Sequence, residues 1–180
     1  MKTLDQRITE IEDHQSIADL CARYFFCIDD RDMDAIGGMF THDGSFGSAD
    51  GAMMAAGPQA VVDQFLGRFP MMGASNHVGH NHLVELLDGN NASGLLSAHA
   101  ELQRNGEAFL IGLRYDDRFR KLEGRWYFQS RTLHFMYYLP LREYAQALGG
   151  LHRNRAGAIA KPADFPEGRP TWKELRPAQA

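Results

Sequence analysis

The sequence has few of the features that mark membrane proteins, nucleic-acid-binding proteins or disulfide-stabilised secreted proteins. Its 180 residues include only two cysteines, and no uninterrupted apolar run approaches the roughly 18 residues that cross a bilayer. Because 23 acidic residues outnumber 19 basic ones, the formal net charge is −4 and there is no extended basic field for nucleic acid. The N-terminus also lacks the apolar core of a signal peptide. We therefore expect a cytoplasmic protein with neither a membrane nor a nucleic-acid partner.

The sequence does contain enough apolar residues for one substantial core. Apolar residues make up 44% of the chain and aromatic residues 11%, which is typical of a soluble globular domain. Cys21 and Cys27 lie six positions apart on one predicted helix, so they face different directions, and we interpret them as small packing residues. We expect one domain over residues 1–150. The proline-rich remainder, 151–180, is predicted to be a tail on its surface or on a neighbouring subunit.

The first 70 residues show hydrophobic spacings that are typical of helices. Apolar residues recur at intervals of three, four and six over residues 5–28, which predicts a long amphipathic helix. A shorter helix is predicted over 32–40, a short strand over 45–48, and a third helix over 58–66 with proline in its first turn. The apolar positions that define the first helix are Ile8, Ile11, Ile17, Leu20, Cys21, Tyr24 and Ile28.

Beyond residue 75 the hydrophobic period becomes that of strands. Glycine and asparagine turns at residues 88–91, 105–106 and 123–124 separate four strands, predicted at about 76–87, 92–104, 107–121 and 125–138. Helices followed by a curved antiparallel meander indicate an α+β architecture, with the helices in the concave face of the sheet. The other face of such a sheet is left bare, so we expect a homodimer or homotrimer.

Three histidines stand at the start of the first predicted strand, in the segment Ser75-Asn76-His77-Val78-Gly79-His80-Asn81-His82. Histidine exchanges protons near neutral pH. The first predicted helix ends in Ile28-Asp29-Asp30-Arg31-Asp32, so one of its carboxylates could meet a histidine. Because a histidine paired with a carboxylate is a device for proton transfer, the sequence favours an acid–base site where helix and strand meet.

A second interpretation makes the same histidines metal ligands. His80 and His82 share a face of a regular strand, and such a pair can bind zinc or another divalent ion. A complete site would need further ligands, for which His99, His134 and Glu101 are the candidates. We prefer the acid–base interpretation, and expect neither a metal nor a cofactor.

Three segments together carry a resemblance to known proteins. The first is Arg23-Tyr24 with Ile28-Asp29-x-Arg31-Asp32 and Met39-Phe40-x-x-Asp43-Gly44-x-Phe46, the second is His77-x-Gly79-x-Asn81, and the third is Gly124-Arg125-Trp126-x-Phe128-x-x-Arg131 with Tyr137-x-x-Pro140-Leu141. Over about residues 10–142 the sequence resembles the scytalone dehydratase and SnoaL-like branch of the nuclear transport factor 2-like superfamily, which also contains lindane dehydrochlorinase and steroid isomerase. The resemblance implies a cystatin-like cone.

The resemblance also implies roles for individual residues. It implies that Asp29 accepts a hydrogen bond from one ring nitrogen of His77, which leaves the other nitrogen as a base facing a pocket. The adjacent Asp30 leaves open which carboxylate meets the histidine. Arg131 would hold a leaving group or a developing oxyanion. The residues expected to bind substrate are Tyr24, Met54, Phe65, His99 and Tyr137.

Two classes of function are consistent with these residues. The first is a cofactor-independent lyase, in which a histidine removes a proton from a small, apolar, cyclic substrate and water or hydrogen halide departs; a steroid-isomerase-like shift of a double bond is a variant of the same chemistry. The second is a non-catalytic binding or interaction module, since one fold hosts unrelated functions. Open space beside His77 would favour the first.

Overall fold

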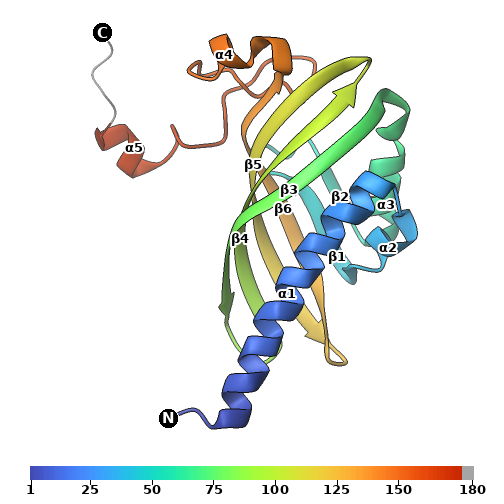
Figure 1. Ribbon diagram of the computed structural model, residues 1–180, viewed down its shortest axis with the longest axis vertical. Coiled ribbons are helices and arrows are strands. Elements are labelled where there is room, and N and C mark those ends of the chain that lie inside the picture. Colours follow the sequence, from blue (N-terminus) through green and yellow to red (C-terminus); the bar gives the residue numbers. More distant parts are fainter. Residues whose placement is uncertain (176–180) are drawn as a thin grey trace.

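The computed structural model describes residues 1–175, so the end of the predicted tail, residues 176–180, lies outside the described residues. Helices precede a strongly curved sheet, as predicted (Figure 1). In chain order the elements are α1 (Leu4–Asp30), α2 (Met33–Gly37), β1 (Phe40–Ser48), β2 (Met54–Ala56), α3 (Pro58–Leu66), the 3₁₀ turn η1 (Phe69–Met71), β3 (Met72–Leu86), β4 (Asn91–Arg104), β5 (Glu107–Leu122), β6 (Arg125–Pro140), η2 (Leu141–Glu143), α4 (Tyr144–Ala147) and α5 (Pro170–Leu175).

Helix α1 is stabilised at its N-terminus and ended sharply at its C-terminus. Thr3 and Gln6 form a capping box, in which each side chain accepts a hydrogen bond from the other residue's backbone N–H. Arg31 ends the helix in the left-handed conformation, with a φ of 58°. The C-terminal part of α1 buries a stripe of side chains at helical spacing: Ile17, Leu20, Cys21, Tyr24, Phe25 and Ile28.

The N-terminal part of α1 extends beyond the sheet (Figure 1). Leu4, Ile8 and Ile11 are 68%, 44% and 67% exposed. The prediction that Ile8 and Ile11 belong to the buried stripe is therefore wrong. Hydrophobic periodicity identifies the helix correctly, but it contains no information about where the sheet ends.

The six strands form one sheet in the order β2-β1-β6-β5-β4-β3. Strands β3 to β6 are the predicted antiparallel meander, and positive φ angles at residues 105–106 and 123–124 close two of its hairpins. Strand β1, however, pairs with β6 in parallel, so the sheet is mixed rather than wholly antiparallel as predicted. The difference arises because no hairpin joins β1 to β6, and turn residues therefore do not determine their relative direction. Strand β2, which no sequence pattern indicated, pairs with β1.

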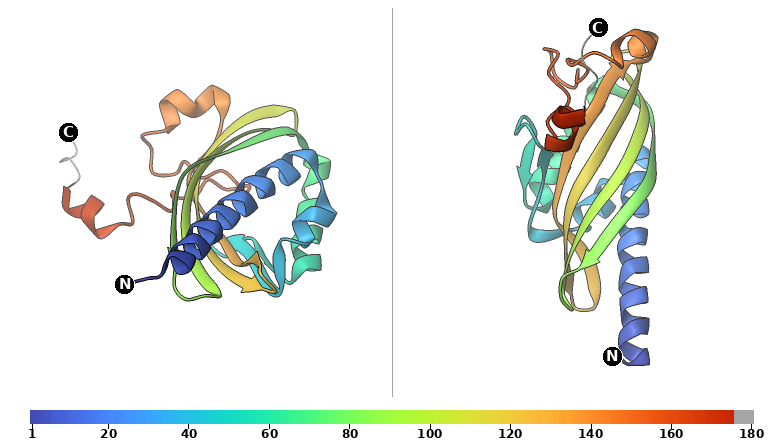
Figure 2. Two further views of the ribbon diagram at one scale, coloured as in Figure 1. Left: turned by 60° about the horizontal axis from the view of Figure 1, so that its bottom comes forward. Right: turned by 90° about the vertical axis from the view of Figure 1, so that its left-hand side faces the viewer.

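The sheet curls around the helices and encloses the core on its concave side (Figure 2). Helix α1 lies against β3, and α3 lies against β1 and β2. The predicted second helix is shorter than expected, since α2 ends at Gly37 and Phe40 already begins β1. Completely or almost completely buried side chains from helices and strands meet in this interior, among them Ile17, Ile36, Phe46, Val61 and Phe128.

A β-bulge in β3 decides which histidines face the concave side. Gly79 pairs with Ala98 and His82 pairs with Leu96, so β3 carries one extra residue between these partners. An extra residue reverses the alternation of side chains beyond it. Consequently His82 turns inward and His80 stays outside, and the prediction that they share one face is wrong.

A second bulge lies in β6 and acts in the same way. Leu113 pairs with Phe135 and Gly112 pairs with Tyr137, which leaves one extra residue on β6. Tyr138 is therefore buried on the concave side, whereas the Tyr137 ring covers Gly112 on the other face.

The segment that follows β6 lies along that strand. Asn154 pairs in parallel with Tyr138, and Asp164 exchanges hydrogen bonds with the backbone of Phe135. Arg153 is only 3% exposed and donates to Glu167 over 2.7 Å. Residues 151–167 of the predicted tail thus pack on the surface of the fold, whereas α5 is exposed and projects away from it (Figure 1). A domain boundary near residue 150 and assembly into a dimer or trimer stay predictions.

Candidate active site

The end of α1 and the start of β3 bring Asp29 and His77 together. The Nδ1 atom of His77 lies 2.6 Å from Oδ1 of Asp29. The backbone N–H of His77 donates to Oδ2 of the same carboxylate over 2.8 Å, and the Ser75 hydroxyl donates to Oδ1 over 2.7 Å. Both carboxylate oxygens thus accept hydrogen bonds. The side chains of His77 and Asp29 are 16% and 18% exposed. Asp29, rather than Asp30, is the carboxylate that meets the histidine.

These hydrogen bonds determine which nitrogen of His77 is available. Burial alone would raise the pKa of Asp29, but hydrogen bonds from the His77 ring, from Ser75 and from the His77 backbone outweigh it and lower the pKa. Asp29 is therefore ionised at neutral pH and can only accept, so Nδ1 carries a proton, and in the neutral form of the ring the free lone pair is on Nε2. The ring also stacks parallel to Phe25, with an interplanar angle of 7°. Tautomer and ring orientation are thus both determined.

The lowered pKa of Asp29 predicts a dependence of stability on pH. Because the folded pKa is below the ordinary value of 3.8, ionised Asp29 stabilises the fold above that value, and this contribution disappears as the pH falls through the folded pKa. Asp29→Asn should therefore lower the free energy of unfolding at pH 7, and the difference from the parent should shrink as the pH falls below about 4. Urea unfolding of both proteins between pH 7 and pH 3 measures this. A difference that stays constant across the range would contradict the assignment.

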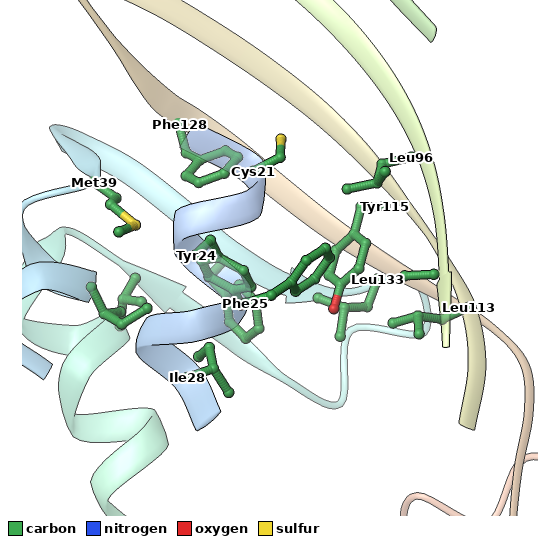
Figure 3. Close-up of a cluster of buried hydrophobic side chains, with 14 of the residues drawn as sticks. Cys21, Tyr24, Phe25, Ile28, Met39, Leu96, Leu113, Tyr115, Phe128 and Leu133 are labelled. Atoms are coloured by element: carbon green, nitrogen blue, oxygen red, sulfur yellow. The ribbon is translucent and has the colours of Figure 1, made fainter. Parts of the chain in front are cut away.

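His77 lies on the wall of a cavity of about 350 Å³, and Asp29 lies behind it. Most of the lining is apolar and comes from both the helices and the sheet, including Ile28, Phe46, Phe65, Leu102, Leu113 and Leu133. Figure 3 shows Ile28 on α1 and, across from it, Leu113 and Leu133 on the sheet. Open space beside the free nitrogen of His77 is the feature that separates a catalytic site from a filled core.

Two buried tyrosines, Tyr24 and Tyr115, line the same cavity (Figure 3). Burial raises the pKa of both phenols above the ordinary value, so both keep their protons at neutral pH. Neither hydroxyl has a hydrogen-bond partner within residues 1–175. They can therefore donate to a polar group of a ligand.

Arg131 does not line the cavity but lies completely buried beneath the two tyrosines. Its Nε and Nη2 atoms donate to the two carboxylate oxygens of Asp117, each over 2.9 Å. Its guanidinium carbon lies 4.3 Å from the ring centre of Tyr24 and 4.2 Å from that of Tyr115. Burial works against the charge, but Asp117 raises the pKa of Arg131 above its ordinary value, so it stays cationic. The prediction that Arg131 contacts a leaving group directly is not supported by this placement.

Three other residues expected in the cavity lie outside it. Met54 is 68% exposed on β2, and the neighbouring Met53 lines the cavity instead. Tyr137 faces outward because of the bulge in β6, and Tyr138 takes the inward position. His99 lies on the convex face, because its neighbours on β4, Ala98 and Ala100, are buried on the concave face. Tyr24 and Phe65 do line the cavity.

The histidines considered as metal ligands are separated by the sheet. His80 and His99 stack on the convex face with Nε2 and Nδ1 2.7 Å apart, whereas His82 faces inward. Among residues 1–175 no three side chains of the ligand-forming types are grouped to hold a metal ion.

Sequence reasoning missed Ser75, Tyr115 and Asp117. Tyr115, Asp117 and Phe119 alternate along β5 and are all buried. Asp117 shares one face of the strand with two aromatic residues, and this pattern could have predicted a buried ion pair. Ser75 lies two residues before His77 on the same face of β3, so strand alternation could have placed it at the dyad.

Within the described residues, no helix is both long and apolar enough to span a membrane.

The comparisons with known proteins agree with this fold. The chain is similar to the crystal structure of a type 2 hexachlorocyclohexane dehydrochlorinase (LinA), at 19% identity and a TM-score of 0.71, over 75% of this chain and 93% of that one. A candidate scytalone dehydratase from Novosphingobium aromaticivorans is 18% identical, with a TM-score of 0.70 over 74% of this chain and 91% of that one. A candidate aromatic ring hydroxylase from the same organism is 26% identical, with a TM-score of 0.68 over 76% of this chain and 98% of that one.

At 18–19% identity, similarity to a solved structure shows a shared fold and does not by itself assign a reaction. The family is established by the sequence match, because the family model described as a SnoaL-like domain covers residues 9–132. The protein therefore belongs to the SnoaL-like domain family of the nuclear transport factor 2-like superfamily.

Proposed function

We propose that the protein is a cofactor-independent lyase that eliminates water or hydrogen halide from a small, mainly apolar, cyclic substrate. The observation that supports this most strongly is the 2.6 Å contact between His77 Nδ1 and Asp29 Oδ1 on the wall of an open cavity. In the neutral ring this contact puts the free lone pair on Nε2, as a general base requires. The shared fold with a dehydrochlorinase is consistent with elimination.

In the proposed reaction, Nε2 of His77 takes a proton from a carbon of the substrate. The electrons of the broken C–H bond form a carbon–carbon double bond, and the bond to the leaving group breaks with its electron pair on halide or hydroxide. Departing hydroxide takes the proton from the His77 imidazolium and leaves as water, whereas after halide departure the imidazolium releases its proton to solvent. Asp29 stabilises the imidazolium that forms, as the carboxylate does in other His–carboxylate pairs. The dyad thus supplies the base without a metal or cofactor.

Tyr24 and Tyr115 are the proposed hydrogen-bond donors to the leaving group or to a carbonyl that activates the C–H bond. Burial raises the pKa of both phenols, while the charge of Arg131 acts in the opposite direction and makes each hydroxyl a better donor than burial alone would. Arg131 is therefore proposed as a positioning residue that acts through the tyrosines. Because its Nε and Nη2 atoms both donate to Asp117, Arg131→Lys would disturb this arrangement even though the charge is kept.

A panel of small cyclic compounds tests the reaction class. It contains β-hydroxy ketones, chlorinated cyclohexanes and β,γ-unsaturated ketones, each with and without a ring carboxylate, incubated with the parent protein and with His77→Ala. Halide release or loss of water that requires His77 supports the proposal. Conjugation of the double bond without a leaving group would indicate a steroid-isomerase-like reaction instead. Binding of panel compounds without any turnover would indicate the non-catalytic module and contradict a lyase.

A further inference from the structure

One cation on the cavity wall has no ion-pair or hydrogen-bond partner among the described residues 1–175. Arg68 follows the end of α3 and lines the same cavity as His77. It is half-buried, and its guanidinium makes neither an ion pair nor a hydrogen bond with residues 1–175. Its guanidinium carbon lies 5.7 Å from the ring centre of Phe65, a cation–π contact that leaves the N–H donors without an acceptor. A guanidinium partly removed from water is costly unless an anion or a hydrogen-bond acceptor compensates it.

The other cations that line the cavity are already engaged. Arg31 donates to the backbone carbonyls of residues 72 and 73, and Arg104 donates to those of residues 155 and 156. Lys161 pairs with Asp50 at 2.5 Å. These side chains hold segments of the chain together, whereas Arg68 holds nothing within the part of the protein that the structure describes. It is therefore the cation that is free to bind a ligand.

The acids near the cavity cannot neutralise Arg68. Asp50 is bound by Lys161 and by the Ser48 hydroxyl, and Asp29 is bound by His77 and Ser75. Burial lowers the pKa of Arg68, but a guanidinium keeps its proton in proteins, so the charge remains. The cavity thus combines apolar walls with one uncompensated positive charge.

We propose that Arg68 binds the carboxylate of the substrate, so that the ligand of this cavity is a small, mainly apolar carboxylic acid in its anionic form. A guanidinium matches a carboxylate with two parallel hydrogen bonds, which are stronger than those between neutral groups. The apolar body of the acid fills the space between Phe65 and Leu133, which is lined by apolar groups. This narrows the substrate class of the proposed lyase and rests on it for the reaction, but binding of the acid does not require turnover.

Charged and neutral ligands of equal size test the proposal. The probes are naphthoate with naphthamide and cyclohexanecarboxylate with cyclohexanecarboxamide, titrated by calorimetry at one fixed ionic strength. The parent should bind each carboxylate about ten- to a hundredfold more tightly than its amide, as expected for a hydrogen-bonded charge pair. Arg68→Gln should remove this preference and leave amide binding nearly unchanged. Arg68→Lys should keep part of it.

Two further variants make the result specific. Arg120→Gln removes the same charge from an exposed position outside the cavity and should keep the preference. His77→Ala should also keep the preference for carboxylates, although it abolishes any elimination. Calorimetry thus tests the acid site, and turnover tests the proposed reaction, independently of each other. Circular dichroism establishes that each variant is folded. Equal binding of acids and amides by the parent, undetectable binding of both acids, or a preference that survives in Arg68→Gln would overturn the proposal.

Discussion

Replacement of His77 by alanine should reduce turnover by about 10² to 10⁴-fold, the range that a positioned general base typically contributes. The reason is that Nε2 of His77 is the proposed base in the cavity, with its tautomer determined by Asp29. Asp29→Asn should also lose much of the rate, because an amide can orient the ring but cannot stabilise its positive charge. The measurement is kcat on a substrate identified from the panel.

His99 provides a matched control for this experiment. It lies on the convex face against His80, so His99→Ala should leave turnover at the parent rate. If His77→Ala is folded and turns over substrate as fast as the parent, His77 is structural. Loss of activity in His99→Ala would contradict its placement outside the site.

Removal of the charge on Asp117 should destabilise the fold by about 3–5 kcal/mol, the usual cost of breaking one partner of a buried ion pair. Both side chains of the pair are 0% exposed, so Asp117→Asn leaves the Arg131 guanidinium in the core without a counterion. Urea unfolding gives the change in free energy.

A double variant distinguishes loss of the whole ion pair from loss of one of its charges. Asp117→Leu combined with Arg131→Met removes both charges, and should be more stable than either single variant because no isolated charge remains. This double variant should nevertheless turn over substrate more slowly than the parent, since the tyrosines lose the adjacent cation. A single Asp117→Asn variant as stable as the parent would contradict the importance of the pair.

Local sequence signals predicted the elements of the fold well, because the physics that produces them is local. The three-, four- and six-residue spacing in α1 and the tight turns of the meander each depend on neighbouring residues. The parallel pairing of β1 with β6 and the exposure of Ile11 depend instead on how distant segments meet. No short-range pattern contains that information.

The candidate site was predictable only up to the strand bulges. His77 lies before the bulge between Gly79 and His82 in β3 and faces the cavity, as alternation from Ser75 requires. Tyr137 lies beyond the bulge in β6, where the alternation is reversed, so its predicted place belongs to Tyr138. Arg131 was singled out from the sequence, but its partner Asp117 was missed, and without that partner its donors appeared free to bind substrate.

The most direct test of the central claim is proton exchange at carbon. The cyclic ketones of the panel are incubated in deuterium oxide with the parent protein and with folded His77→Ala, and deuterium uptake beside the carbonyl is followed by mass spectrometry. The dyad predicts that the parent accelerates uptake in at least one ketone and that His77→Ala does not exceed the buffer rate. Equal uptake with the two proteins, or no acceleration by the parent with any of the ketones, would contradict the assignment of His77 as the base.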